Sequence, residues 1–195
     1  LENIKIKKSH PIEVIITSMK LNSHQLRKSG VGESQKKQKL IKRNPLVLVL
    51  DNVLDTYNIG SFFRLADALG AQKIYLCGPV VTPPNLKIHR ASIGTWKWIE
   101  WEHFDNTIDC IKQLKKEKYQ LIACEQGKNT VDYLKAKYSF PLAIIAGSES
   151  KGISKTILKM CDQTIEIPMY GINISLNVLL ATAVIGFQAL SHLKK

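Results

Sequence analysis

Short apolar runs alternate with amphipathic segments from Pro45 onward. An unbroken apolar run such as Leu46–Leu50 is typical of a strand covered on both faces. Ile59–Leu69 has apolar residues at helical spacing, and Gly70 follows it where a helix commonly ends. The whole pattern predicts, in order, strand Leu46–Leu50, helix Ile59–Leu69, strand Lys73–Cys77, a proline-rich loop, a weak strand Trp98–Trp101, helix Asn106–Lys118, strands Gln120–Cys124 and Leu142–Ala146, helix Lys155–Met160, strand Thr164–Ile167 and helix Ser175–Leu193.

Strands separated by helices predict an α/β fold, with a parallel sheet flanked by helices on both faces. The last predicted helix is apolar around most of its circumference. Such a helix cannot lie on the surface of a monomer with one face in water. This helix either lies in the core or meets another subunit. For a domain of this size we favour the second arrangement, which is a homodimer.

Positive charge is concentrated before this pattern begins. The 195 residues include 28 Lys and Arg against 16 Asp and Glu, a formal net charge of +12, and residues 1–43 hold eleven of the basic and three of the acidic ones. We therefore predict a basic N-terminal arm at 1–43, partly helical (around Ser18–Lys28) or flexible, and one domain at 44–195. Basic side chains displace counterions from phosphates, so the arm favours a nucleic-acid partner over the other interpretation, a solubilising tail.

Metal, membrane and secretory functions find no support in the sequence. The four cysteines are widely separated, no C-x-x-C occurs, and the five histidines show no metal-ligand spacing. We expect reduced thiols in a cytoplasmic protein, without a metal. No apolar run reaches the roughly 20 residues that span a bilayer, and no apolar segment follows the basic N-terminal stretch as in a secretory signal.

Three segments at predicted strand ends are rich in Gly, Asn and Ser: Asp51–Arg64, Ala146–Gly152 and Pro168–Asn177. Ligands of parallel α/β sheets bind at these ends. Gly147 and Gly152 have Walker A spacing, but Ile153 stands where that motif requires Lys, which argues against an ATPase or kinase. No G-x-G-x-x-G follows a strand and no G-x-S-x-G occurs, so a dinucleotide fingerprint and a hydrolase elbow are missing too.

The polar residues of these segments also have plain structural explanations. Asn58 or Gly60 would cap the helix that follows, and Arg64 would be a solvated helix charge. Because Arg64 directly follows Phe62-Phe63, we expect that it need not face bulk water.

The later segments allow similar explanations. Glu149 would be a solvated residue in a turn, Ser175 a helix N-cap, and Asn177 no more than a first-turn residue. Each residue alone gives weak support for a function, but the three segments in this order form a specific pattern.

That pattern resembles the motifs of SpoU-type (TrmH-like) RNA ribose 2′-O-methyltransferases of the SPOUT superfamily. The resemblance extends from Pro45 to about Leu193 and includes Arg90-Ala-Ser-Ile-Gly94. The motifs are Asn58-x-Gly60-x-x-x-Arg64, Gly147-x-Glu149-x-x-Gly152 and Ile167-Pro168-Met169-x-Gly171-x-x-x-Ser175-Leu176-Asn177-Val178.

The resemblance implies a C-terminal deep trefoil knot, a homodimer with active sites at its interface, and S-adenosyl-L-methionine (AdoMet) bound in the knot loops. The methyl acceptor would be a ribose 2′-hydroxyl of structured RNA, either tRNA or rRNA. By motif position, the cofactor residues would be Cys124, Gly147, Ile167, Met169 and Leu176. The catalytic group would comprise Arg64, acting across the dimer interface, and the residues that hold it and the ribose, Asn58, Glu149, Ser175 and Asn177.

The chemistry leaves the role of Arg64 open. A ribose hydroxyl must lose its proton to attack, yet arginine normally stays protonated in proteins. Arg64 would thus act either as a base tuned by an RNA phosphate or as an orienting group. Two departures from the family are Leu179-Leu180, where Ser or Ala is common, and the 1–43 arm. Two other functions remain open, a non-catalytic RNA-binding knot protein and a base methyltransferase of the same fold.

Overall fold

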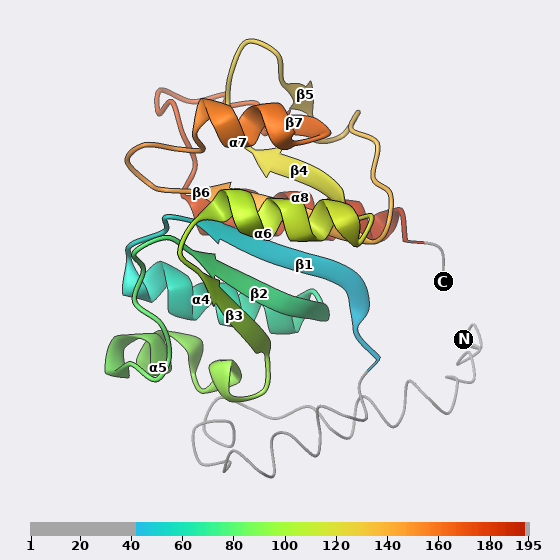
Figure 1. Ribbon diagram of the computed structural model, residues 1–195. Coiled ribbons are helices and arrows are strands. Elements are labelled where there is room, and N and C mark those ends of the chain that lie inside the picture. Colours follow the sequence, from blue (N-terminus) through green and yellow to red (C-terminus); the bar gives the residue numbers. More distant parts are fainter. Residues whose placement is uncertain (1–41, 194–195) are drawn as a thin grey trace, which may run out of the picture.

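The computed structural model describes residues 42–193. The helix expected around Ser18–Lys28 and nearly all of the expected arm lie outside the described residues. Within 42–193 the elements are, in chain order, β1 Asn44–Asp51, α4 Thr56–Ala68, β2 Ala71–Cys77, α5 Leu86–Ser92, the 3-10 helix η1 Thr95–Lys97, β3 Glu100–Phe104, α6 Thr107–Lys116, β4 Gln120–Cys124, β5 Val131–Asp132, β6 Leu142–Gly147, α7 Lys155–Met160, β7 Gln163–Glu166 and α8 Val178–Ser191 (Figure 1).

The strands form one parallel sheet in the order β3-β2-β1-β6-β4-β7-β5. The chain first builds from β1 to the β3 edge, and its later strands are added on the opposite side of β1. The strand order therefore reverses beside β1, whose neighbours are β2 and β6. Ligands of such sheets bind outside the carboxyl ends of the strands at this switch point. The topology therefore predicts a site at the carboxyl ends of β1, β6, β4 and β7.

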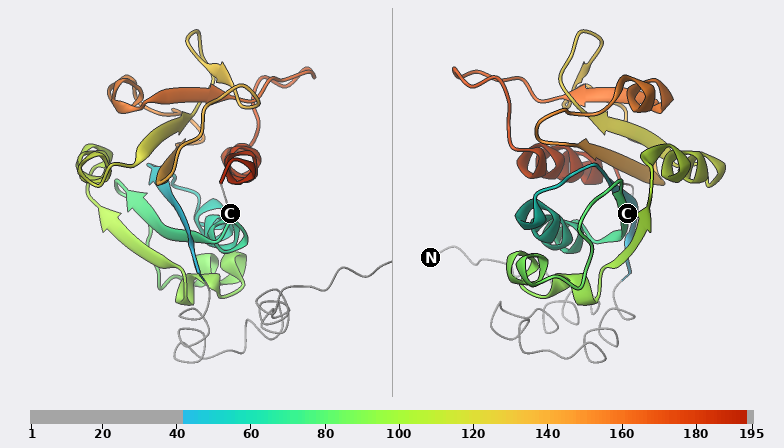
Figure 2. Two further views of the ribbon diagram at one scale, coloured as in Figure 1. Left: turned by 90° about the vertical axis from the view of Figure 1, so that its right-hand side faces the viewer. Right: turned by 60° about the vertical axis from the view of Figure 1, so that its left-hand side comes forward.

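Helices cover both faces of the sheet, as the sequence predicts. Figure 2 shows α4, α5 and α8 on one face and α6 and α7 on the other. Alternate side chains of β1 serve the two layers, because successive residues of a strand point to opposite faces. Leu46, Leu48 and Leu50 belong to the core cluster that includes α4 and α8, whereas Val47 and Val49 belong to the cluster under α6 and α7.

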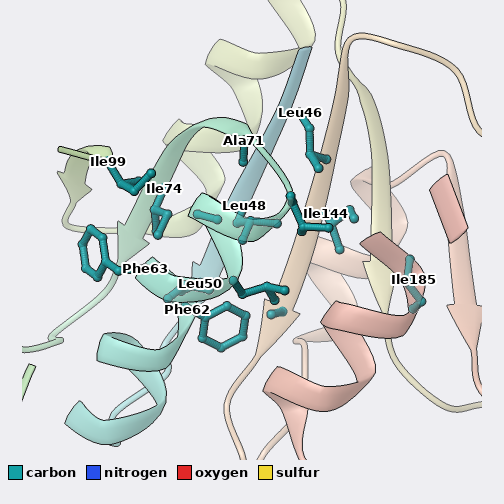
Figure 3. Packing of buried hydrophobic residues seen from close by; sticks show 14 of the residues in the cluster. Leu46, Leu48, Leu50, Phe62, Phe63, Ala71, Ile74, Ile99, Ile144 and Ile185 are labelled. Atoms are coloured by element: carbon teal, nitrogen blue, oxygen red, sulfur yellow. The ribbon is translucent and has the colours of Figure 1, made fainter. Parts of the chain in front are cut away.

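The helices α4 and α8 pack against each other as well as on the sheet. Phe62 and Phe63 of α4 and Ile185 of α8 are fully buried in one cluster with the β1 leucines (Figure 3). Gly186 of α8 lies against Leu69, where an added Cβ would be 2.7 Å from Leu69 Cδ1. Because truncating a buried Phe to Ala costs about 3–5 kcal/mol, this layer contributes strongly to the stability that supports the site.

Most of the predicted elements are confirmed to within a few residues, namely those that correspond to β1, α4, β2, α6, β4, β6, α7 and β7. The expected glycine after the first helix is also confirmed, because Gly70 has φ +60° directly after the C-cap Leu69. Among residues 42–193, no helix combines the length and apolar character needed to cross a membrane.

The prediction of a strand at Trp98–Trp101 is wrong in its position. Trp98 ends the 3-10 helix, its backbone N–H donating to Thr95 O at 3.1 Å, and its indole Nε1 donates to Asp67 Oδ1 at 3.0 Å. The strand β3 therefore begins only at Glu100. The helix α5 and the two-residue strand β5 were not predicted. The last helix begins at Val178, after the predicted start at Ser175.

Candidate active site

A pocket of about 370 Å³ lies at the carboxyl ends of β4, β6 and β7. Its walls come from three separate segments, the end of β4, the loop between β6 and α7, and the segment from β7 into α8. This position beside the switch point is the one that the sheet topology favours. The volume falls within the range of roughly 300–1,000 Å³ that is typical of small-molecule sites.

The loop between β6 and α7 turns so tightly that glycine is needed at both ends. Gly152 has φ +61°, a conformation that side chains rarely adopt, and an added Cβ would lie 2.2 Å from Glu125 Oε2. An added Cβ at Gly147 would lie 2.6 Å from the carbonyl carbon of Gly152. The backbone N–H of Gly152 donates to Ser148 O at 2.8 Å, which closes the turn. The glycine spacing of the second motif is therefore a requirement of this turn.

Glu125 holds this loop against the end of β4, and the sequence prediction missed it. Its Oε2 accepts from the backbone N–H of Ile153 at 2.8 Å, and its Oε1 accepts from that of Gln126 at 3.0 Å. The signal that could have found Glu125 is its place directly after the predicted strand Gln120–Cys124, at the edge where ligands bind.

A hydrogen bond joins the first two motifs. Asn58 Nδ2 donates to Glu149 Oε1 at 2.7 Å, although the two residues are 91 positions apart. The expectation that Asn58 or Gly60 caps the helix is wrong, because Asp55 is the N-cap and accepts from Tyr57 N at 2.8 Å. The Asn58 amide is therefore available for the contact with the loop. Glu149 is exposed, but it lines the pocket and is not merely a solvated turn residue.

The third motif forms part of the wall of the pocket. Asn177 is the N-cap of α8, and its Oδ1 accepts from the backbone N–H groups of Leu179 at 2.9 Å and Leu180 at 3.4 Å. The expectation that Ser175 caps this helix and that Asn177 is a first-turn residue is therefore wrong. Ser175, Leu176 and Asn177 all line the pocket.

Three of the expected site residues do not line the pocket within one chain, and one of them, Asn58, is connected to it only through its hydrogen bond to Glu149. Arg64 lies on α4, is exposed, and has no hydrogen-bond or ion-pair partner among residues 42–193. The expectation that it need not face bulk water is wrong for the single chain, because Phe62 and Phe63 point into the core and do not shield it. Met169 is half-buried in the segment after β7 and does not line the pocket. The expected cofactor residues that do line it are Cys124, Gly147, Ile167 and Leu176.

The pocket walls favour a positively charged ligand. Carboxylates of Glu125, Glu149 and Glu166 line it, and none of its lining residues is Lys or Arg. The pKa of the Cys124 thiol is raised to about 12, first by burial and then by the carboxylate of Glu125, while a hydrogen bond with Thr182 acts in the opposite direction. The thiol is therefore neutral near pH 7. No group of three or more His, Cys, Asp or Glu in the described part of the chain is placed to hold a metal ion.

The protein is therefore of the parallel α/β class, with a pocket at the carboxyl ends of its strands, where proteins of this class commonly bind nucleotide-like ligands. The chain matches the SpoU rRNA Methylase family over residues 45–187. It belongs to this family, which confirms the resemblance that the three motifs indicate.

Its relatives include RNA methyltransferases. The chain is 31% identical over 149 residues to the tRNA (guanosine(18)-2'-O)-methyltransferase of Aquifex aeolicus, an alignment that covers 76% of this chain and 70% of the relative. It is 32% identical to the 23S rRNA (guanosine-2'-O-)-methyltransferase RlmB of Vibrio parahaemolyticus, with 74% of this chain and 58% of the relative covered. The chain thus spans less than two thirds of the Vibrio enzyme.

Solved structures agree with this assignment. An AdoMet-bound rRNA methyltransferase from Sinorhizobium meliloti superposes with a TM-score of 0.73 at 29% identity, covering 87% of this chain and 61% of that one. The TrmH/SpoU tRNA modifying enzyme of A. aeolicus superposes with a TM-score of 0.72 at 27% identity, covering 91% and 83%.

Proposed function

We propose that this protein transfers a methyl group from AdoMet to a ribose 2′-hydroxyl of tRNA or rRNA. The observation that carries the proposal is the meeting of all three motif segments, two at the pocket walls and the first through the Asn58–Glu149 hydrogen bond. Family membership and the 2'-O-methyltransferase relatives support it. A tRNA or rRNA substrate is consistent with the cytoplasmic location that the sequence predicts.

The lining of the pocket suits the charge and the apolar parts of AdoMet. Its three carboxylates suit a sulfonium cation, and the neutral thiol of Cys124 and the side chains of Ile167 and Leu176 offer apolar contact. Gly147 lines the pocket, and the place that a Cβ would take there is already filled by Gly152 and Ile153. Cys124, Gly147, Ile167 and Leu176 would contact the cofactor directly, and Met169 would border it from the segment after β7. When bound there, AdoMet supplies a methyl group that the sulfonium already activates.

The protein must then position the hydroxyl and receive its proton. Asn58 fixes the Glu149 carboxylate, which lies at the pocket wall with Ser175 and Asn177. Ser175 can donate to or accept from a ribose hydroxyl, whereas the Asn177 Oδ1 is already engaged by the α8 N-terminus. Arg64 would orient the hydroxyl or accept its proton beside an RNA phosphate.

Because Arg64 does not reach its own pocket, we infer a homodimer in which a second copy supplies it. The outer face of α8 supports this arrangement, since Leu180, Val184 and Phe187 are 52%, 37% and 53% exposed. The segment before α8 adds Ile172 and Ile174, which are almost fully exposed. Light scattering should give twice the chain mass, and Phe187→Glu should give the single-chain mass. A monomeric wild type that still transfers methyl groups would contradict the dimer.

We also infer the deep trefoil knot that the resemblance implies. Its support is the path of the chain, which leaves β7 near one edge of the sheet and returns under β4 and β6 as α8. A knot holds part of the chain when both ends are pulled apart. Single-molecule extension should therefore end short of the contour length of about 3.3–3.6 Å per residue. Full extension would contradict the knot.

Incubation with methyl-labelled AdoMet and total RNA, followed by alkaline hydrolysis, tests the proposed function. A methylated 2′-oxygen cannot attack the adjacent phosphate, so the label should remain in alkali-resistant dinucleotides. Label in mononucleotides would indicate base methylation, and binding of RNA without any transfer would indicate a non-catalytic RNA-binding protein. Either result would overturn the proposal.

The role of Arg64 has its own test. Arg64→Ala should lower methyl transfer by about 100-fold or more, the order typical of losing a general base or an orienting group. AdoMet affinity, measured by calorimetry, should not change, because Arg64 does not line the pocket. Full activity of this variant would remove Arg64 from the mechanism.

A further inference from the structure

The helices α4 and α5 and the 3-10 helix η1 hold more basic than acidic side chains. Together they include four Lys and Arg, namely Arg64, Lys87, Arg90 and Lys97, but only one acidic residue, Asp67. Asp67 is already engaged, since its Oδ1 accepts from the Trp98 indole and lies 3.4 Å from Arg43 Nη1. The pocket walls have the opposite character, with three carboxylates and no basic side chain. A polyanion would therefore be attracted to the helical layer and repelled by the pocket walls.

The helix α5 presents part of this charge on one exposed face. Lys87 and Arg90 are exposed and three positions apart, a spacing that places them on the same side of a helix. Ile88 and Ser92, on the other side, are fully buried. Within the described residues, neither Lys87 nor Arg90 has a hydrogen-bond or ion-pair partner. Both side chains are therefore available to an outside ligand.

Local hydrogen bonds hold this face rigidly. The Asn85 side chain caps α5 by accepting from Lys87 N at 2.9 Å, and the Ser92 hydroxyl accepts from Gly94 N at 3.2 Å just after the helix. The Trp96 indole donates to His89 Nδ1 at 3.0 Å, which fastens η1 to α5. The middle motif Arg90-Ala-Ser-Ile-Gly94 is thus a structural unit that fixes one end of the basic face.

The basic face also lies beside the proposed catalytic helix. An added Cβ at Gly60 would be 2.6 Å from Ala91 Cβ and 2.8 Å from Ile88 O, so α5 packs directly on the backbone of α4. Gly60 lies between Asn58 and Arg64, and Arg64 follows it one turn later on nearly the same side of α4. Figure 1 shows α5 near the edge of the sheet toward which β1 and β2 point.

We propose that the Lys87 and Arg90 face of α5 binds phosphates of the RNA backbone and guides the substrate to Arg64. This inference rests on the proposed function and adds to it the surface that receives the RNA. Phosphate contacts of this kind position a substrate without reading its sequence. The face should therefore contribute to affinity for any structured RNA that the protein accepts.

The test compares the double variant Lys87→Ala/Arg90→Ala with a matched control, Lys115→Ala/Lys116→Ala. Lys115 and Lys116 are exposed on α6, across the sheet, so the control removes the same charge from another surface. Binding of unfractionated tRNA is measured between 50 and 200 mM salt, and melting and AdoMet affinity are measured in parallel. All four replaced side chains are exposed, so both variants should fold and bind AdoMet as the wild type does.

We expect the α5 variant to bind tRNA about tenfold more weakly and to lower the slope of log affinity against log salt by about two, one for each lost phosphate contact. The KM for RNA should rise while kcat at saturating RNA stays within about twofold. The control should match the wild type in slope. The inference would be overturned if both variants had the same salt slope, or if both lost the same amount of affinity for tRNA. A wild type that binds tRNA through α5 but transfers no methyl group would overturn the proposed function instead.

Discussion

Glu125 shows how one carboxylate can organise the wall of a pocket. It accepts from two backbone N–H groups and joins the end of β4 to the loop between β6 and α7. Glu125→Ala leaves the Ile153 N–H without its partner, which should lower the free energy of unfolding by about 1–2 kcal/mol. The loosened loop should also weaken AdoMet binding by about tenfold, since 1.4 kcal/mol corresponds to a factor of ten.

Urea denaturation and calorimetry of the variant check both effects. The control is Glu100→Ala, which removes an exposed carboxylate at the start of β3, away from the pocket. If Glu125→Ala bound AdoMet as tightly as the control does, Glu125 would have no role in shaping the pocket.

For single residues, the sequence predicts the roles of glycines better than those of polar side chains. The spacing of Gly147 and Gly152 indicates a turn. Only glycine tolerates the close backbone approach at Gly147 and the positive φ at Gly152. The partner of Asn58 is not visible, since any Asn near a helix start resembles a cap until Asp55 is seen to take that place. The capping role of Asn177 was hidden by Ser175, an equally good cap two residues earlier.

Among the secondary-structure elements, the contact between α4 and α5 depends on Gly60. Replacing glycine by alanine within a helix ordinarily stabilises it by roughly 0.5–1 kcal/mol. Here the new methyl group would collide with Ala91 Cβ and Ile88 O. Gly60→Ala should therefore destabilise the protein by about 1–3 kcal/mol, the usual effect of overpacking. It should also weaken RNA binding by displacing α5.

The sign of the change in the free energy of unfolding distinguishes overpacking against α5 from the ordinary stabilisation of a helix by alanine. Ser61→Ala, the next residue of the same helix, is half-exposed and should change the free energy of unfolding by less than about 0.5 kcal/mol. Urea denaturation of both variants gives the comparison. A stabilised Gly60→Ala protein would show that α5 does not pack on α4 in solution.

The elements that the sequence predicts well are those buried on both faces or amphipathic over several turns. Strand β1 is such a case, with five apolar residues in a row that serve two core layers. Helix α5 is short and follows Pro83-Pro84, so its pattern was hidden in an apparent loop. Tryptophan is common in strands, yet the hydrogen bond from the Trp98 indole to Asp67, 31 positions away, holds Trp98 in the turn before β3.

For the whole molecule, several buried groups predict a loss of stability in alkali. Burial raises the pKa of Cys124, Cys161 and Tyr138 to about 12 each. In the unfolded chain thiols and phenols lose their protons near pH 8.5–10, so there the unfolded state binds fewer protons than the folded state does. The free energy of unfolding should therefore be nearly constant up to about pH 8.5 and fall as the pH rises toward 12.

Urea denaturation at pH 7.5, 9.5 and 10.5 measures this dependence. The variant Cys161→Ala removes one of the groups and should show a shallower decline. A free energy of unfolding that stays constant or rises between pH 9 and 11 would contradict the burial of these groups.

For the architecture of the whole molecule, the sequence predicts the layers but not the order of the strands in the sheet. Apolar runs indicate a parallel sheet with two helical layers, yet nothing in the order of the runs places β4 between β6 and β7. That placement brings Cys124 beside Ile165 and closes the pocket. Only the family resemblance indicated that the three segments meet, because contacts between distant residues such as Asn58 and Glu149 leave no local pattern.

A crystal structure of the protein with AdoMet would show directly whether three distant loops form one cofactor site. We expect AdoMet in the pocket at the ends of β4, β6 and β7, in contact with Cys124, Gly147, Ile167 and Leu176. Glu149 and Ser175 should face the side from which the ribose approaches. AdoMet bound at another surface, or a pocket closed to it at saturating concentration, would show that these loops do not form the cofactor site.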